Sequence, residues 1–381
     1  MLKNNKIFKT SDLQKLDKYT IENEPVTSLD LMERAATVFT EKLLIFFPNS
    51  HIFNILAGSG NNGGDGYVVA RLLCQNGLNV KVFGLHENDH LSPDCVVNRE
   101  RFINMGGCYI EVKNPDNLQP DENSVLVDAI FGAGLNRPVT GFLGDIIRRI
   151  NSLSHPVVAI DMPSGLMGED NGENNGAIIK ADYTFTFQFP KLAFMFPENV
   201  VYVGHWEVLD IRLHPVILRE YPAAYYYLTE EVVASRLLIP GKFSHKGTLG
   251  NTLLIVGSYS MMGAAVLAAK GAIRSGTGLL SVHVPRKLKE MIHLSVPEAL
   301  VEVDRNEFCF SGVDNLSRFQ AVGIGSGIGT SPVTAEGIRQ LLSVWRGKIV
   351  LDADALNLLA ADLGLLELLP DGAVLTPHPK E

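Results

Sequence analysis

The stretch that decides the fold is residues 58–66, Gly58-Ser59-Gly60-Asn61-Asn62-Gly63-Gly64-Asp65-Gly66. The preceding residues 51–58 (HIFNILAG) form a short apolar run, which is typical of a buried strand. Residues 67–77 (YVVARLLCQNG) predict a helix that ends at Gly77, and residues 79–85 (NVKVFGL) predict another strand. The stretch therefore links a strand to a helix. We expect its glycines to adopt positive φ and to expose N–H groups at the helix N-terminus, where an anion can bind.

The same alternation of elements continues on both sides of this stretch. Residues 10–47 have the pattern of two helices, the second beginning at a Ser28 cap. Further strands are predicted at SVLVDAIF (124–131), PVVAID (156–161), DYTFTFQF (182–189) and HWEVLD (205–210). Because strands alternate with helices, we predict an α/β fold, a Rossmann-like three-layer sandwich with a mostly parallel sheet.

A second α/β series follows a connector. It comprises the predicted elements TLLIVG (252–257), GAAVLAAKGAIRSG (263–276), LLSVHVP (279–285), AVGIGSGIG (321–329) and KIVLDADALN (348–357). We therefore predict a first domain at residues 1–212, a connector at 213–242 and a second domain at 243–381. The sequence ends at VLTPHPKE (374–381), just after a strand, so we expect the second domain to be incomplete.

Composition narrows the classes of protein. The formal charge of −9 argues against a general nucleic-acid binder, which would carry a basic surface. No apolar stretch has membrane-spanning length, and the N-terminus lacks the apolar core of a signal peptide. The four cysteines form no CxxC pair, so we expect buried free thiols. These features predict a cytoplasmic protein with no membrane or nucleic-acid partner.

Polar side chains gather in three loops that follow three predicted strands. Each has an ordinary structural explanation: tight turns use glycine, an aspartate such as Asp128 caps helices, and Asp161 forms Asx turns. Loops at the carboxyl ends of parallel strands, however, meet at one edge of the sheet, where ligands bind. We therefore predict one cleft lined by Asn61, Asn62, Asp65, Asp128, Asp161 and Ser164.

The types of residue indicate the chemistry of this cleft. The oxygens of Asn62, Asp128 and Ser164 suit a hard cation, and the carboxylate of Asp161 suits proton transfer. Lys191 follows a strand and could meet a phosphate or a carboxylate, but we expect a solvated side chain.

The loops also carry a family likeness. The motifs GSGNNGGDG (58–66), VDAIFGAGLNR (127–137) and DMPSG (161–165), with LMERA (31–35), closely resemble the NAD(P)H-hydrate epimerase domain over roughly residues 8–212. The resemblance implies interconversion of the R and S forms of hydrated NADH or NADPH, with Asp161 as the acid or base. It implies a potassium site at Asn62, Asp128 and Ser164. The implied substrate-binding residues are Asn61, Asn62, Gly63, Gly64, Asp65, Gly132, Ala133, Gly134, Leu135, Asn136, Arg137, Pro138 and Asp161.

The second half resembles the ribokinase-like NAD(P)H-hydrate dehydratase. The motifs are residues 245–282, VGIGSGIG (322–329), LDADALN (351–357) and LTPHPKE (375–381). The resemblance implies dehydration of the S form with ADP or ATP and magnesium. It places Ala264, Gly327 and His378 at the hydrate, and Asp352, Asp354 and Asn357 near the phosphates or their metal. The glycines could equally form a tight turn, and His378 an ordinary loop histidine.

The family pattern continues beyond TPHP with a lysine-containing loop and a GSGD-type turn, which this sequence lacks. We therefore expect this chain alone not to dehydrate the hydrate efficiently. Two alternatives remain: a ribokinase-like small-molecule kinase, which leaves the first-half motifs unused, and a non-catalytic nucleotide-binding module. Apolar residues 43–47 of a predicted helix also lead us to expect a homo-oligomer.

Overall fold

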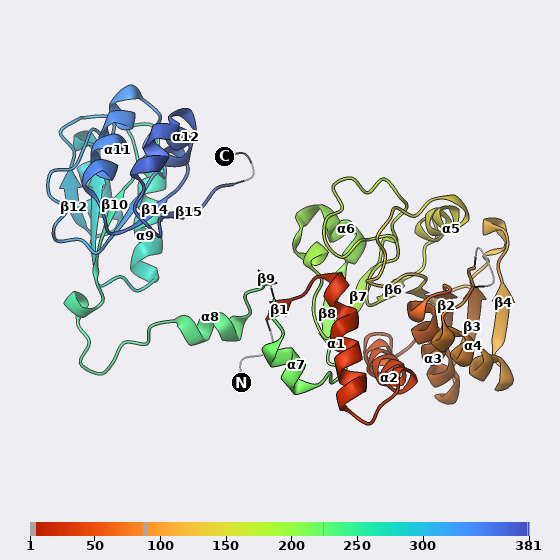
Figure 1. The fold of residues 1–381 in the computed structure, drawn as a ribbon. Coiled ribbons are helices and arrows are strands. Elements are labelled where there is room, and N and C mark those ends of the chain that lie inside the picture. The colour runs from red at the N-terminus through yellow and green to blue at the C-terminus, as the bar shows by residue number, and fades with distance from the viewer. Residues whose placement is uncertain (1–4, 87–89, 224, 379, 381) are drawn as a thin grey trace. The chain divides into compact units, whose positions relative to one another are not determined.

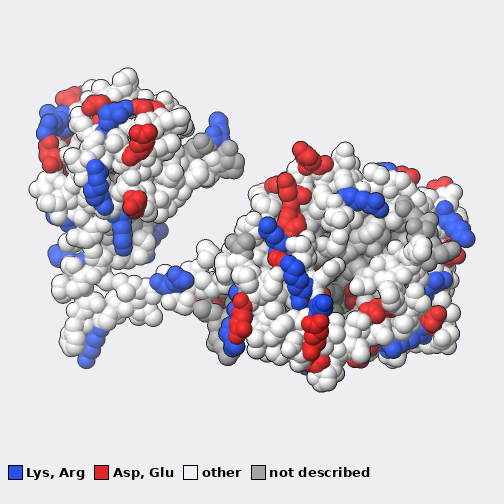
Figure 2. All heavy atoms as spheres, viewed as in Figure 1, with Lys and Arg blue, Asp and Glu red and all other residues white. Residues whose placement is uncertain are grey.

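The computed structural model describes residues 5–86, 90–223, 225–378 and 380 (Figure 1). It divides into two compact units, Met1–Leu237 and Leu238–Glu381. Each unit is an α/β structure built on its own parallel sheet, which confirms the predicted fold class. On the face of the molecule shown in Figure 2, acidic and basic side chains are interspersed.

The sheet of the first unit has seven strands, all parallel, in the order β4-β3-β2-β5-β6-β7-β8. The strands are β2 (Ile52–Ala57), β3 (Asn79–Gly84), β4 (Cys108–Glu111), β5 (Val125–Ala129), β6 (Val157–Ile160), β7 (Tyr183–Phe187) and β8 (His205–Leu209). All residues of β5 and β6 are buried, because helices cover both faces of the sheet.

Helices form the outer two layers of the first unit. The helices of this unit are α1 (Thr10–Asn23), α2 (Ser28–Phe46), α3 (Asn61–Gln75), α4 (Pro93–Asn104), α5 (Gly141–Asn151), α6 (Val200–Val203), α7 (Pro215–Glu220) and α8 (Glu230–Arg236). Helix α8 has no buried residue and belongs to neither layer. Side chains from α2, α3 and α4 share one core with Phe53 and Ile55 of β2. Side chains of α5 pack with Leu56 on the opposite face. Successive strand residues thus serve different layers, as the period of a strand requires.

Helix α1 lies over the carboxyl edge of the sheet as part of a smaller core. Leu16 of α1 is fully buried in this core, together with Phe189 and Leu213. A two-stranded antiparallel ribbon, β1 (Lys6–Ile7) with β9 (Tyr225–Tyr226), joins both ends of the unit. This ribbon was not predicted, because strands of two residues carry no detectable period.

Three predictions about the first unit need correction. Thr27, rather than Ser28, caps α2, and it forms a capping box with Asp30. Within residues 43–47, Leu43 is fully buried, so these residues do not form the exposed apolar patch from which we expected an oligomer. All four cysteines are free, but only Cys95 is buried, and Cys108 is exposed.

The second unit has a six-stranded parallel sheet in the order β12-β11-β10-β13-β14-β15. The strands are β10 (Asn251–Ile255), β11 (Leu279–Val284), β12 (Leu300–Val303), β13 (Ala321–Ile324), β14 (Lys348–Leu351) and β15 (Val374–Leu375). Its helices are α9 (Met262–Arg274), α10 (Lys289–Ser295), α11 (Pro332–Val344) and α12 (Asp354–Ala361). Two apolar clusters hold these helices to the sheet. Among the described residues, no helix is long and apolar enough to cross a membrane.

Candidate active site

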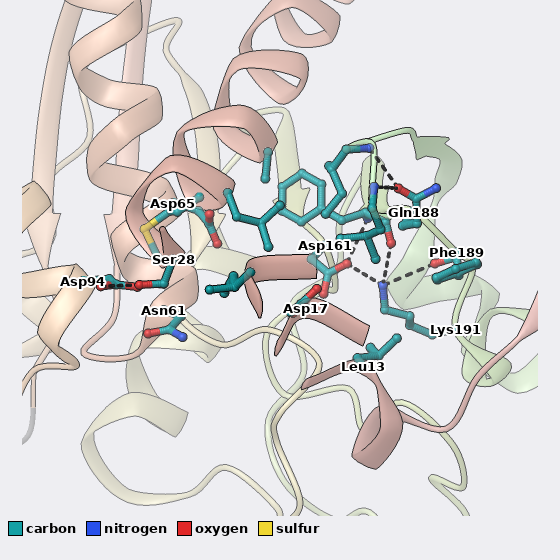
Figure 3. A pocket seen from close by; sticks show the side chains of 17 residues that line it. Leu13, Asp17, Ser28, Asn61, Asp65, Asp94, Asp161, Gln188, Phe189 and Lys191 are labelled. Atoms are coloured by element: carbon teal, nitrogen blue, oxygen red, sulfur yellow. Dashed lines mark hydrogen bonds and ion pairs between the residues drawn. The ribbon is translucent and has the colours of Figure 1, made fainter. Parts of the chain in front are cut away.

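A cavity of about 480 Å³ lies at the carboxyl ends of β2, β5 and β6 in the first unit. A smaller cavity of about 210 Å³ adjoins it, with apolar walls that include Leu31, Met32 and Ile211 (Figure 3). Both cavities are lined by Leu13, Asp17, Asn61, Asp65, Asp161 and Phe187. These shared residues form the neck between the two spaces. Of the residues predicted to line one cleft, Asn61, Asn62, Asp65 and Asp161 line these cavities, whereas Asp128 and Ser164 are fully buried and line neither.

The glycine-rich turn is shaped by close approach of the backbone. A Cβ on Gly58 would lie 2.1 Å from the carbonyl oxygen of Ile130, and a Cβ on Gly63 would lie 2.0 Å from that of Gly58. None of the five glycines of this turn is among the described residues with positive φ. The prediction of positive φ is therefore wrong. Gly58 instead lets the loops after β2 and β5 touch, and Gly63 lets the turn close on itself.

The first turn of α3 presents backbone donors at the cavity. Asn61 and Asn62 line its wall, and within the described part of the chain the N–H groups of Asn61, Asn62 and Gly63 donate no hydrogen bond. Free donors at a helix N-terminus, together with the helix dipole, favour an anionic ligand group. The helix and its turn thus have free donors where the sequence predicts an anion site.

The second and third loops meet at a buried carboxylate. Asp128, at the end of β5, is fully buried and accepts hydrogen bonds from the hydroxyl and the N–H of Ser164, at 2.5 and 2.7 Å. Ser164 in turn accepts a bond from the N–H of Phe131 at 2.8 Å. Burial raises the pKa of Asp128 to about 6, although the bonds from Ser164 oppose this shift. The Asp128 side chain is thus a structural link between the two loops, and it caps no helix.

Asn62 completes this part of the site. Its side chain lies against Gly132, where an added Cβ would be 3.3 Å from the Asn62 Cγ. The Asn62 Nδ2 is buried and has no hydrogen-bond partner. A buried carboxylate with no lysine or arginine bound to it among the described residues fits a monovalent cation held by oxygens, to which the Asn62 side chain could add its amide oxygen.

Asp161 stands at the end of β6 in an unusual backbone conformation. Its φ is 64°, and the N–H of the next residue, Met162, bonds back to Ile160 at 2.7 Å. This turn places the carboxylate among the side chains of the smaller cavity that Figure 3 draws, and Asp161 lines the larger cavity as well. Left-handed backbone at a residue other than glycine is uncommon and tends to occur at functional sites.

The two oxygens of the Asp161 carboxylate have different surroundings. Oδ1 accepts hydrogen bonds from the Thr186 hydroxyl and the Phe187 N–H, each at 3.0 Å, and from the Lys191 ammonium at 2.5 Å. Among the described residues, Oδ2 has no hydrogen-bond partner. One oxygen therefore fixes the orientation of the group, while the other remains free for a ligand in the cavity.

Lys191 is the residue that sequence reasoning judged wrongly. Its side chain is only 2% exposed, so the expectation of a solvated lysine is wrong. The ammonium lies within hydrogen-bond distance of the Thr186 hydroxyl, at 2.7 Å, and of two backbone carbonyls as well as Asp161. The only signal in the sequence was its position just after a strand that ends at the predicted cleft.

Two more carboxyls face the neck. Burial, with the charge of Asp161, raises the pKa of Asp17 on α1 to about 6. Although the Asp65 side chain is partly exposed, burial of its carboxyl raises the pKa well above its ordinary value, and Asp161 adds to the shift. Asp17 was missed because it lies on a predicted helix far from the motifs, and only the packing of α1 over the sheet brings it to the site.

The other first-half predictions divide into lining and supporting residues. Residues 132–137 line the larger cavity, as expected. Pro138 instead packs against Gly176, where an added Cβ would be 3.0 Å away. Gly64 lies against Met32 inside the protein, and neither Gly63 nor Gly64 lines a described cavity.

The second unit also gathers its predicted residues at the carboxyl ends of its strands. Gly325, Gly327 and Gly329 all have positive φ. This turn therefore requires glycine for its backbone conformation, unlike the turn at residues 58–66. A Cβ on Gly327 would lie 2.9 Å from that of Ala264, which places these two residues side by side.

The predicted phosphate or metal residues lie at the same edge. Asp352 accepts hydrogen bonds from Thr376 at 2.8 Å and from Ser326 at 3.2 Å, and Asp354 accepts one from the Gly329 N–H at 2.8 Å. Asn357 is exposed on α12, and His378 is exposed after β15. The structure thus joins Asp352 and Asp354 to the glycine turn, whereas Asn357 and His378 stand at the surface.

The fold and these cavities define an α/β enzyme with two units, each carrying a polar cluster at the carboxyl edge of a parallel sheet. A family model described as the N-terminus of YjeF-related proteins matches residues 28–193, and one described as NAD(P)H-hydrate dehydratase matches residues 252–381.

Known proteins share both halves. A bifunctional NAD(P)H-hydrate repair enzyme from Moorella thermoacetica is 33% identical over 388 residues, a match that covers 97% of this chain and 73% of that protein. Its counterpart from Synechocystis sp. is also 33% identical, over 98% of this chain and 71% of its own. A crystal structure of the ADP/ATP-dependent NAD(P)H-hydrate dehydratase from Bacillus subtilis is 32% identical; the match covers 34% of this chain and 46% of that one, with a TM-score of 0.30.

The chain belongs to the family of bifunctional NAD(P)H-hydrate repair enzymes, and it carries both an epimerase and a dehydratase domain. The two alternatives, a small-molecule kinase and a non-catalytic module, are therefore not needed. A dehydratase domain is present in the second unit, because the dehydratase family model matches residues 252–381. Its six-stranded sheet has two apolar cores, which the position of the last strand in the sequence did not reveal.

Proposed function

We propose that the cavity of the first unit binds hydrated NADH or NADPH and interconverts its R and S forms, with Asp161 transferring the proton. The observation that carries this proposal is the asymmetry of the Asp161 carboxylate. Oδ1 is held by Lys191, Thr186 and a backbone amide, while Oδ2 faces the neck of the cavity without a protein partner among the described residues. Such a group is oriented before substrate arrives.

The two cavities suit the two ends of the substrate. The free amides at the start of α3 would receive the pyrophosphate, alongside Asn61, Asn62 and the loop at 132–137. Gly63, Gly64 and Pro138 would support these contacts from behind. The smaller, largely apolar cavity would take the hydrated ring, so that its hydroxyl-bearing carbon reaches Asp161 and Asp65 at the neck.

The reacting carbon bears a hydroxyl and is bonded to the ring nitrogen. Loss of the hydroxyl requires a proton, and return of water to the other face releases one. A carboxylate fixed at the neck can accept that proton through its free oxygen. The nitrogen lone pair stabilises the cation formed in between.

We also propose that Asn62, Asp128 and Ser164 hold a potassium ion. The bound ion would supply positive charge that offsets the burial of Asp128 and fixes the loops around the cavity. A Ser164→Ala variant should lose any acceleration of epimerisation that potassium gives to the unaltered protein over sodium. A variant that keeps the full potassium response would remove Ser164 from the proposed ion site.

For the second unit we propose dehydration of the S form with ADP or ATP and magnesium. Ala264, Gly327 and His378 would contact the hydrate, and Asp352, Asp354 and Asn357 would lie near the phosphates or their metal. The support is the clustering of Asp352 and Asp354 at the glycine turn. A dehydratase of this family that was crystallised with ATP and magnesium matches this unit.

We further propose that the epimerase domain spans residues 1–212, the connector 213–242 and the dehydratase domain 243–381. The free state of all four cysteines supports a reducing cytoplasmic location. A homo-oligomer remains a prediction, to be tested by light scattering.

The first activity is tested by following R-to-S conversion chromatographically with purified chain. Asp161→Asn keeps the size of the side chain and tolerates its left-handed backbone. It should lower the rate at least about 100-fold while the hydrate still binds. Full activity in this variant would overturn the role proposed for Asp161.

A further inference from the structure

We propose that Asp17 is the second proton-transferring group of the epimerase site, acting from helix α1 while Asp161 acts from the end of β6. This inference rests on the proposed epimerase function. Inversion requires the hydroxyl to leave from one face of the ring and to return to the other. One fixed carboxylate reaches only one face, so the chemistry calls for a second group.

Asp17 and Asp65 both line the two cavities with Asp161, and the element that carries Asp17 distinguishes it, because Asp65 lies on α3. Asp17 lies on α1, whereas Asp161 follows β6, so the two carboxyls come from different layers of the unit. Both line the larger and the smaller cavity, and Figure 3 shows them next to each other at the neck. Helix α1 is held there by Leu16, which is fully buried one residue earlier. A ring that bridges the two cavities would therefore lie within reach of both Asp17 and Asp161.

The electrostatic surroundings of the two groups differ. Asp161 is bound to the buried ammonium of Lys191, whereas no hydrogen bond to the Asp17 side chain is found among the described residues. Burial and the negative charge of Asp161 raise the pKa of Asp17 to about 6, and Lys191 opposes the shift only in part. Asp65 on α3 is the other charged group at the neck. Neighbouring carboxyls in unlike surroundings divide the roles of acid and base.

The reaction balances with one proton on the pair. Protonated Asp17 gives its proton to the hydroxyl, the carbon–oxygen bond breaks with its electrons on oxygen, and water leaves. The ring nitrogen shares its lone pair with the carbon. Water then adds to the other face, and Asp161 takes the released proton. The hydroxyl has changed face, one proton has moved from Asp17 to Asp161, and the reverse reaction exchanges these roles.

The test compares purified full-length variants in R-to-S conversion between pH 5 and 8, after subtraction of the uncatalysed rate. Because protonated Asp17 starts the reaction, kcat/KM of the unaltered chain should fall as pH rises above about 6. Asp17→Asn should lower kcat about 100-fold or more and remove this fall. Asp17→Glu keeps an acid there and should retain it. Asp12→Asn, on the same helix but paired with Lys15 and Tyr221 outside the cavities, is the matched control and should behave like the unaltered chain.

Several outcomes would overturn the proposal. The first is an Asp17→Asn variant with native circular dichroism that keeps either the rate of the unaltered chain or its fall in kcat/KM above about pH 6. The second is an Asp65→Asn variant that removes this fall. If Asp17→Asn does not fold, a kcat/KM of Asp17→Glu that does not change with pH would also overturn the proposal. Loss of activity in Asp161→Asn alongside these results would leave the epimerase site standing without Asp17. Full activity in Asp161→Asn would instead reject the proposed function itself.

Discussion

The Asp161–Lys191 pair holds the candidate site together at the scale of single residues. The Lys191 side chain is 2% exposed and the Asp161 side chain 13%, and the ammonium contacts the carboxylate at 2.5 Å. A buried ion pair is favourable only while both partners are present, because a lone buried charge loses its hydration without compensation. The pair is therefore a sensitive probe of the site.

We predict that Lys191→Met lowers the free energy of unfolding by about 3–5 kcal/mol, since it leaves Asp161 without its cation. Adding Asp161→Asn should recover part of this loss, which a double-mutant cycle in urea would measure. Lys15→Met, which removes an exposed partner of Asp12, is the control and should leave stability unchanged. Additive effects of the two buried substitutions would contradict the pairing.

Sequence reasoning identified most of the site residues but misjudged the two that depend on tertiary packing. Asp161 and Ser164 could be predicted, because both follow an apolar strand in a turn motif. Lys191 and Asp17 could not, because burial and charge partners depend on segments far away in the chain. Asp17 is 144 positions from Asp161 in the sequence. Only the packing of α1 against the rest of the unit brings the two residues together.

At the scale of elements, the glycine turn and the loop after β5 form one interlocked unit. Gly58 has no space for a side chain, because its Cβ would meet the backbone of Ile130. The start of α3, and with it the free amides at the cavity, depends on this contact.

We expect Gly58→Ala to destabilise the protein by about 1–3 kcal/mol and to impair binding of the hydrate, since backbone must move to admit the methyl group. Gly134→Ala is the matched control for stability alone, because a Cβ there meets no atom within 4 Å but the residue lines the cavity. Thermal and urea unfolding of both variants would show the difference. Equal stability of the two variants would mean that the loops after β2 and β5 are not locked together.

The elements themselves were largely predictable, since apolar strands and glycine-closed helices have strong local patterns. The reason why the turn at residues 58–66 requires glycine could not be predicted. Their number suggested positive φ, but close approach of two loops requires glycine for a different reason, and a neighbour in space leaves no local signal. In the second unit the glycines at 325, 327 and 329 do adopt positive φ.

At the scale of the whole molecule, the protein consists of two units that each have their own sheet and cores. Every residue that lines the two cavities of the candidate epimerase site lies in the first unit. In the chain segment that connects the two units, the side chains of Leu238, Ile239 and Phe243 are 79–88% exposed. The sequence predicted two domains and a connector here from the change of pattern alone.

Brief digestion with chymotrypsin should therefore cut first near Phe243 and release two fragments that remain folded. The N-terminal fragment should keep the epimerase activity of the intact chain, because its cavity is complete without the second unit. A Phe243→Ser variant should be cut more slowly at this point. Early cuts within residues 28–193, or loss of epimerase activity as the fragment forms, would show that the first unit depends on the second.

The most direct test of the whole account is the crystal structure of the Asp161→Asn variant with NADH hydrate bound. We predict pyrophosphate oxygens at the amides of Asn61 and Asn62, and the hydroxyl-bearing carbon within reach of Asp17 and position 161. A hydrate bound away from the neck of the two cavities, with both side chains left facing solvent, would contradict it.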